Sequence, residues 1–311
     1  MLNKPMDQML PQIFAGLDVW QILAVAVKAL TYSATFISTG GIVFLFLFSA
    51  YSSAQAQSVI RRFVFYTALV GIVSSVARIA VMNSMLSGEW RGMFDIGMTR
   101  MVLASKEGLA TGSRLLGLLL LVISVRSRMS SWRRVIGFAS AAIAATSFSW
   151  VGHAGEIAMK AGPEKLPQLL LSLHLLAIAF WLGALWPLHR CTYGENIHAI
   201  AAIMYRFGRI AAFVVALLVA GGALLLWLII GDVSALWNSA YGQSMLTKLC
   251  AVALLLALAA LNKLRLTPLL LNGDSAAIYK LRYSIKAEMV LAALILLITA
   301  FFTTVVGPTR P

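Results

Sequence analysis

Long apolar runs recur along the whole chain and are separated by short polar stretches. They predict helices at 23–49, 63–86, 101–124, 135–157, 168–188, 208–230, 244–264 and 285–306. Each run is close to or above the roughly 20 residues that an α-helix needs to cross about 30 Å of hydrocarbon. A soluble fold has no need of so many runs of this length. The pattern therefore predicts an all-α integral membrane protein with eight transmembrane helices.

Composition supports this prediction and limits the partners. Hydrophobic residues make up 60% of the chain and charged residues only 12%, whereas soluble domains carry about 25% charged residues. The formal net charge is +14. Because membrane proteins concentrate Lys and Arg in their cytoplasmic loops, this excess does not indicate nucleic acid. We expect the lipid bilayer as a partner and no nucleic acid.

Basic residues gather in alternate loops, which predicts the orientation in the membrane. One set of loops is strongly basic, and the other set mixes a few cations with carboxylates. Since the basic loops of membrane proteins face the cytoplasm, we expect both termini in the periplasm and a multi-pass protein of the bacterial inner membrane. The basic set comprises Arg61, Arg62, Arg126, Arg128, Arg133, Arg134, Arg190, Arg206, Arg209, Lys263, Arg265, Lys280, Arg282 and Lys286.

The second half of the chain resembles the first. With Leu30 aligned on Leu173, Gly40 falls on Gly183, and a later alignment places Arg114 on Lys248. Corresponding helices keep one orientation, which indicates a parallel tandem repeat of four-helix units. We therefore expect an external N-terminal segment at 1–22, one membrane unit at 23–157, a second at 158–306 and an external tail at 307–311.

The stretch SWVGHAGE, residues 149–156, places a histidine and a glutamate at the end of a predicted helix. His153 lies just before a short outward loop and His174 just after it, so both imidazoles are expected at similar depth. Glu156 lies three residues after His153 and shares its helix face, and Met159 follows. Two imidazoles, a carboxylate and a thioether form a set of donors that suits copper. The alternative is that the histidines anchor helix ends at the interface.

Methionines gather toward the predicted outward side. Two pairs are spaced by three residues, Met82 with Met85 and Met98 with Met101. Thioethers bind Cu(I) and need no deprotonation, although methionine is also an ordinary apolar filler. We expect a periplasm-facing His/Met metal site drawn from His153, His174, Glu156, Met159, Met82, Met85, Met98 and Met101.

The sequence lacks familiar catalytic patterns. It contains no GxxxxGK[ST] phosphate loop, and the Ser/His/Asp arrangement of a hydrolase is not visible. We therefore expect no enzyme activity.

The stretches GHAGE and LHLLAIAFWLGAL lie in the second half of the chain, and through them this half resembles the copper resistance protein D family. The resemblance spans roughly 145–306, including GHAGE and LHLLAIAFWLGAL, and fades over the first four predicted helices. It implies an inner-membrane protein that handles copper, Cu(I) or Cu(II), as its substrate, beside a separate periplasmic copper-binding protein. Thr31 stands opposite His174 in the repeat, so no symmetric second metal site is expected. The most specific positions are Tyr241, Gly242, Lys248, Asn262, Pro268, Arg282 and Glu288.

Three functions fit these observations. The first is a copper permease or copper-tolerance factor. The second is a membrane b-type haem or quinone oxidoreductase, because His174 and His189 lie on one helix about 22 Å apart at 1.5 Å per residue. The third is an assembly factor that delivers copper to another membrane enzyme.

Overall fold

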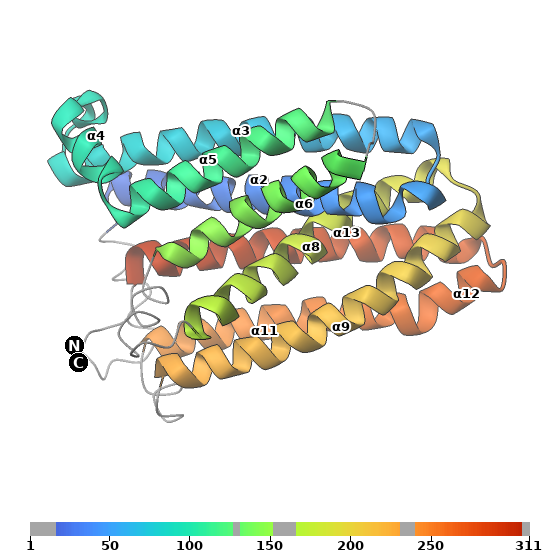
Figure 1. The fold of residues 1–311 in the computed structure, drawn as a ribbon. Helices are drawn as coiled ribbons and strands as arrows, with labels where there is room; N and C mark the ends of the chain where they lie inside the picture. The colour runs from blue at the N-terminus through green and yellow to red at the C-terminus, as the bar shows by residue number, and fades with distance from the viewer. Residues whose placement is uncertain (1–16, 127–130, 152–165, 231–239, 307–311) are drawn as a thin grey trace.

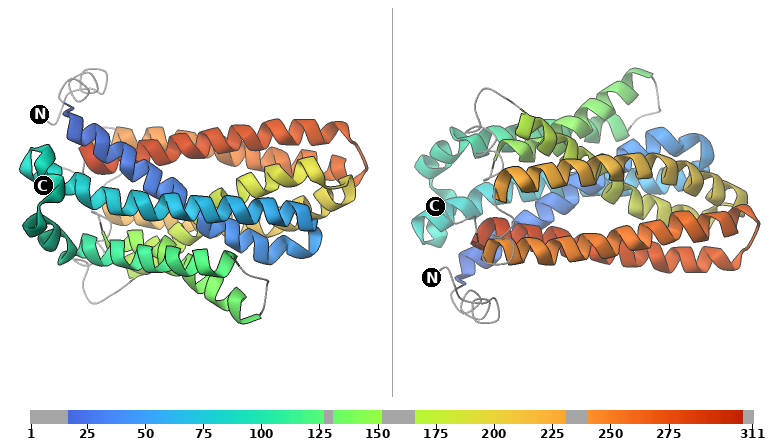
Figure 2. Two further views of the ribbon diagram at one scale, coloured as in Figure 1. Left: turned by 90° about the horizontal axis from the view of Figure 1, so that it is seen from above. Right: turned by 90° about the horizontal axis from the view of Figure 1, so that it is seen from below.

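The computed structural model describes residues 17–126, 131–151, 166–230 and 240–306. This part of the chain is helical and contains no strand. Long helices run along one common axis and form a bundle (Figures 1 and 2). Its helices are α2 (Val19–Phe48), α3 (Ala54–Ser87), α4 (Ile96–Leu103), α5 (Lys106–Val125), α6 (Ser131–Thr146), α8 (Leu166–Gly194), α9 (Ile197–Ile230), α11 (Ala240–Leu261), α12 (Thr267–Leu271) and α13 (Ala276–Phe301).

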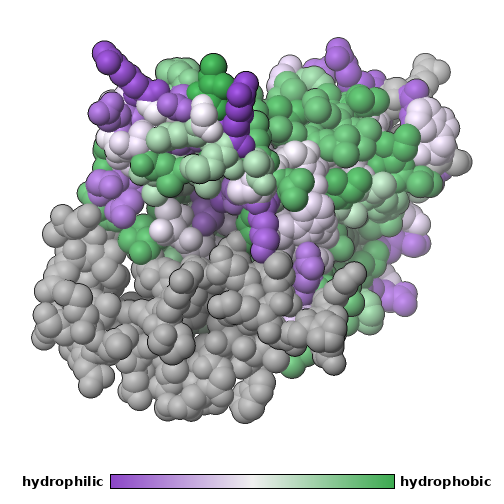
Figure 3. Space-filling view, turned by 60° about the vertical axis from the view of Figure 1, so that its left-hand side comes forward, coloured by the Kyte–Doolittle hydropathy of each residue, from purple (hydrophilic) through white to green (hydrophobic). Residues whose placement is uncertain are grey.

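Seven helices in the described residues are long and apolar enough to cross a membrane. Many of their large apolar side chains are exposed at mid-helix, for example Val73 on α3 and Val290 on α13. Apolar side chains also form much of the surface at the right of Figure 3. Such a surface is unfavourable in water and suits contact with lipid. The chain is therefore a multi-pass membrane protein.

The eighth predicted span, 135–157, falls on α6, which has 16 residues. At 1.5 Å per residue α6 is about 24 Å long, less than the hydrocarbon thickness. The short 3-10 helix η3 (Ser147–Trp150) follows it, and 152–157 lies outside the described residues. Eight spans therefore remain a prediction.

Several predicted boundaries were wrong because local capping and solvent-facing turns extend or divide the helices. Helix α3 begins at Ala54 rather than 63, since Ser53 accepts a hydrogen bond from the Ala56 backbone amide. Helix α9 begins at Ile197 rather than 208. The predicted helix at 101–124 is divided, because Ser105 caps α5 after α4 has ended. These polar turns extend the bundle beyond its apolar layer.

The two ends of the bundle differ in charge. At one end, Arg206 lies over the Tyr51 ring at 4.2 Å, and Arg282 lies over the Tyr193 ring at 4.0 Å. The basic loops predicted for one side of the membrane meet at this end. The start of α2 and the segment that follows α13, η5 (Phe302–Val306), lie together at the opposite end (Figure 1), where Lys28 Nζ donates to the Thr303 carbonyl oxygen.

Helices α2 and α8 lie at the centre, with α5 and α6 on one side and α11 and α13 on the other (Figure 2). Their backbones meet at Gly40 and Gly183. A Cβ atom added to Gly40 would lie 2.7 Å from the Gly183 Cα atom, so only glycine permits this approach. The repeat alignment pairs these same two residues, and the repeat itself remains a prediction.

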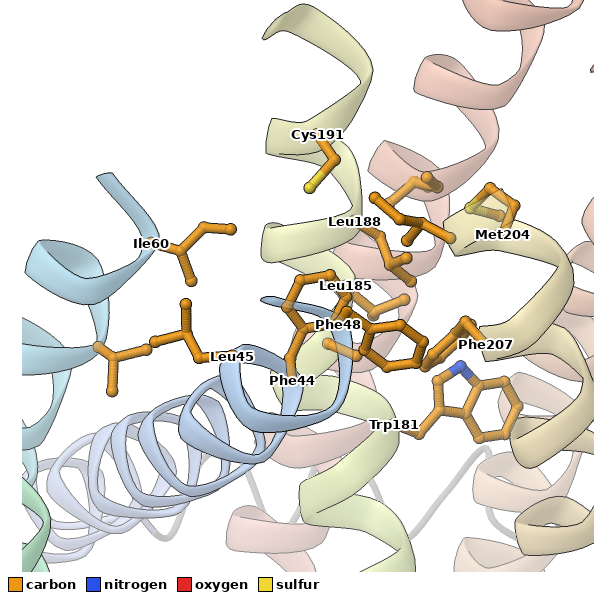
Figure 4. Close-up of a cluster of buried hydrophobic side chains, with 14 of the residues drawn as sticks. Phe44, Leu45, Phe48, Ile60, Trp181, Leu185, Leu188, Cys191, Met204 and Phe207 are labelled. Carbon is orange, nitrogen blue, oxygen red and sulfur yellow. The ribbon is translucent and has the colours of Figure 1, made fainter. Parts of the chain in front are cut away.

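Aromatic and aliphatic side chains fill the interior toward the basic end. Figure 4 shows Phe44 and Phe48 of α2 packed beside Leu185 of α8, with Phe207 of α9 above Trp181. All are nearly inaccessible to solvent. This packing fixes α2, α8 and α9 against one another, and with them the depth at which the polar residues of α8 lie.

Candidate functional site

His174 lies eight residues into α8, between α8 and α9. Its imidazole faces Gly222 of α9, where an added Cβ would lie 3.6 Å from Cε1. The Leu218 backbone is also close to the ring. Nδ1 is buried and has no hydrogen-bond partner in the described part of the chain. A buried donor or acceptor without a partner is unusual, so within the described residues Nδ1 is available to a ligand.

Lys248 of α11 lies near His174 and, in its charged form, acts on the imidazole. Neither residue has an ion-pair partner among the described residues. A cation bound to the imidazole would be repelled by the ammonium group. Metal binding at His174 therefore requires further donors, and an anionic or soft donor would offset the repulsion.

Three of the predicted donors, His153, Glu156 and Met159, lie outside the described residues. The chain leading toward them is fixed to α8, because Ser172 donates a hydrogen bond of 3.0 Å to Ser149. Ser172 precedes His174 by two residues. This hydrogen bond joins η3 to α8 close to His174. In the described ranges no three His, Cys, Asp or Glu side chains form a metal-binding group.

The four predicted methionines lie at the same end of the bundle as the start of α8, but on other helices. Met82 and Met85 belong to α3, and Met98 and Met101 to α4. A 2.8 Å hydrogen bond from Asn83 to Thr99 holds α4 against α3. Helix α4 packs against α3 and α5, so Met98 and Met101 lie beside the helix that carries Met82 and Met85, and their approach to His174 stays a prediction.

A charged cluster lies between α3 and α5. Arg78 of α3 and Glu107 of α5 form an ion pair of 2.8 Å, with each side chain 13% exposed. Arg114 of α5 is fully buried, donates from Nε to Ser147 at 3.2 Å and lies 4.0 Å from the centre of the Phe148 ring. Spacing alone gave no signal for the pair, because the two residues come from different helices.

Replacing Glu107 with Gln should destabilise the first half of the bundle. The substitution leaves Arg78 and Arg114 close together without the carboxylate between them, and breaking a buried ion pair costs about 3–5 kcal/mol. Partial exposure reduces this to roughly 2–3 kcal/mol. Thermal unfolding in detergent measures the effect, with Glu89→Gln, at an exposed position, as the matched control. Equal melting temperatures for the two variants would contradict a structural role for the pair.

Comparison with known proteins finds similarity along most of the chain. A family model described as copper resistance protein D matches 201–302, and one described as the copper resistance protein D-like N-terminal domain matches 17–165. The chain is 27% identical over 256 residues to copper resistance protein D of Pseudomonas syringae pv. tomato, covering 76% of this chain and 81% of the relative. It is 24% identical over 282 residues to inner membrane protein YebZ of Escherichia coli (strain K12), covering 86% and 95%. No solved structure matches.

Proposed function

The chain belongs to the copper resistance protein D family, and on that premise we propose that it moves copper ions across the bacterial cytoplasmic membrane. Copper is its substrate, as Cu(I) or Cu(II), and the chain carries out no catalysis. A separate periplasmic copper-binding protein supplies or receives the ion. The observation that carries the proposal is the His174 imidazole, held between two membrane helices with a free nitrogen.

The proposed copper site is completed from the loop that precedes α8. His153 adds a second imidazole, and Glu156 or Met159 adds the carboxylate or thioether that the charge of Lys248 makes necessary. Imidazole, carboxylate and thioether together accept both oxidation states of copper. The methionines of α3 and α4 form a second group of soft donors at the same end, suited to capture of Cu(I) before it reaches His174.

The proposed orientation places this end in the periplasm. The opposite end collects the basic residues, including Arg206 and Arg282 beside tyrosine rings, and basic ends of membrane proteins face the cytoplasm. A reporter that fluoresces only in the cytoplasm, fused after Pro311, should therefore remain dark. The same reporter inserted at Gly273, in the exposed turn between α12 and α13, should be bright. The reverse pattern would place His174 near the cytoplasm and remove the case for periplasmic capture.

Metal uptake into proteoliposomes tests the proposed function. Purified protein is reconstituted, and the uptake of Cu(I), Cu(II) and Zn(II) is followed with a metal-sensitive dye enclosed in the vesicles. We expect faster uptake of copper than in protein-free vesicles, and little uptake of zinc. Uptake equal to that of protein-free vesicles would contradict transport, and a haem Soret band in the purified protein would favour the oxidoreductase instead.

A further inference from the structure

Glu288 is a buried carboxyl group in the middle of α13. It is the thirteenth residue of a 26-residue helix and is 3% exposed. Apolar residues of the same face, Ile285 and Ala292, are part of the main hydrophobic core. A carboxyl group at this depth is costly, and ionisable residues within membrane spans usually have a function.

Two polar side chains from other helices meet this carboxyl group. Asn262 Nδ2 donates a hydrogen bond to Glu288 Oε1, and the Trp181 indole lies within hydrogen-bonding reach. Asn262 opens η4 (Asn262–Leu266), a π-helical segment after α11. π-Helical segments are rare in proteins, and those that occur are often found at functional sites. Here the π-helical segment begins at Asn262, the residue that donates the hydrogen bond to Glu288.

No cation in the described part of the chain forms an ion pair with Glu288. The hydrogen bonds to its carboxyl group come from Asn262 and Trp181, which are uncharged. Neither donor would offset the negative charge of an ionised Glu288. None of the charged or titratable groups on the elements packed against Glu288 is among the groups that act on it, which are Trp181 and Asn262. The charged and titratable groups on those elements are Lys28 on α2, His174, His189 and Arg190 on α8, Lys248 on α11, Lys263 and Arg265 on η4, and Lys280, Arg282 and Lys286 on α13.

Two buried oxygen acceptors on residues near Glu288 suit its protonated form as well. Ser284 lies one turn earlier on α13, and its Oγ is buried without a hydrogen-bond partner in the described residues. Asn262 Oδ1 is likewise buried and without a described partner. A protonated carboxyl group has an O–H donor that these atoms can accept. The site can therefore hold the carboxyl group in either protonation state.

Glu288 is connected to the proposed copper site through α8. His174 and Trp181 are seven residues apart, which places them on one face of the helix about 10 Å apart along its axis. Trp181 lies within hydrogen-bonding reach of Glu288, and His174 faces Gly222 of α9. Trp181 therefore joins the two sites, because it shares a helix face with His174 and lies within this reach of Glu288.

We propose that Glu288 is a proton-binding site that exchanges its proton for the transported cation. The protonated carboxyl group releases H⁺ as copper arrives, giving a carboxylate paired with the metal ion, and takes up H⁺ again as copper leaves. Charge is conserved for Cu(I), because one proton replaces one monovalent cation, and no electron is transferred. The exchange with copper rests on the proposed function, whereas the proton-binding site does not.

Infrared difference spectroscopy tests the proton-binding site without transport. A pH titration of purified wild-type protein should show a carbonyl band of a protonated carboxyl group. The band should be absent in Glu288→Gln, shifted in Glu288→Asp and unchanged in Glu89→Gln. Size-exclusion profiles establish that each variant is folded. An identical band in wild type and Glu288→Gln would overturn the proposed site.

Proton movement in proteoliposomes tests the exchange. A pH-sensitive dye is enclosed in the vesicles. As the wild type takes up copper, protons should leave the vesicle interior, and the dye should report a rise in internal pH. Glu288→Gln should lower copper-driven proton movement at least tenfold while copper binding is retained. Copper uptake without proton movement in the wild type would overturn the exchange. If the wild type moves no copper, the proposed transport fails and the infrared titration alone decides whether Glu288 binds a proton.

Discussion

Replacing His174 with Ala should weaken copper binding at least about 100-fold, which corresponds to about 2.7 kcal/mol. The imidazole has a free buried Nδ1 and faces Gly222, so alanine removes a donor without introducing a steric conflict. His153→Ala should have a similar effect if the loop supplies the second imidazole. Isothermal titration with Cu(II), and competition with a Cu(I) chelator, measure both affinities.

His198→Ala is the matched control for this prediction. His198 is exposed near the start of α9, in the half of the bundle that carries the basic loops. Its removal should leave copper affinity unchanged, which separates a specific site from general binding by histidine. Wild-type affinity in the His153→Ala, His174→Ala double variant would mean that the two histidines only anchor helix ends.

Replacing Gly183 with Leu should abolish accumulation of folded protein. A Cβ atom at this position would lie 2.7 Å from the carbonyl oxygen of Phe36 on α2, and backbone atoms cannot move aside as flexible side chains do. The penalty should exceed the about 1–3 kcal/mol typical of overpacked cores. The fraction that elutes as a monodisperse peak after detergent extraction measures the result.

Gly112→Leu provides the control for the glycine contact. Gly112 lies on an exposed face of α5, and a Cβ atom added there meets no atom within 4 Å. Both substitutions introduce the same side chain into a membrane helix, so only the contact with α2 differs. Equal yields from the two variants would show that the α2–α8 contact is not needed for folding.

The sequence predicted the helical membrane fold because apolar run length is set by bilayer thickness. Helix ends were less accurate, because capping residues such as Ser53 extend α3 beyond the apolar layer. The resemblance was expected to fade before residue 145, yet the family similarity extends through 17–165.

The candidate site was only partly predictable. His174 lies near the start of α8, as expected for a residue that follows a short loop. Which methionines approach it depends on how α3 and α4 pack against α8, and sequence spacing does not give that packing. The contact between Asn262 and Glu288 joins residues on separate helices through a π-helical segment. Sequence spacing contains no signal for such a contact.

X-ray absorption spectroscopy of the copper-loaded protein tests the central claim, that copper binds at His174 within the membrane bundle, most directly. The account predicts scattering from imidazole nitrogen in the wild type, accompanied by oxygen or thioether sulfur from the preceding loop. It also predicts that the imidazole contribution decreases in His174→Ala and not in His198→Ala. A copper spectrum that is the same in wild type and His174→Ala, or that contains no imidazole contribution, would contradict the claim.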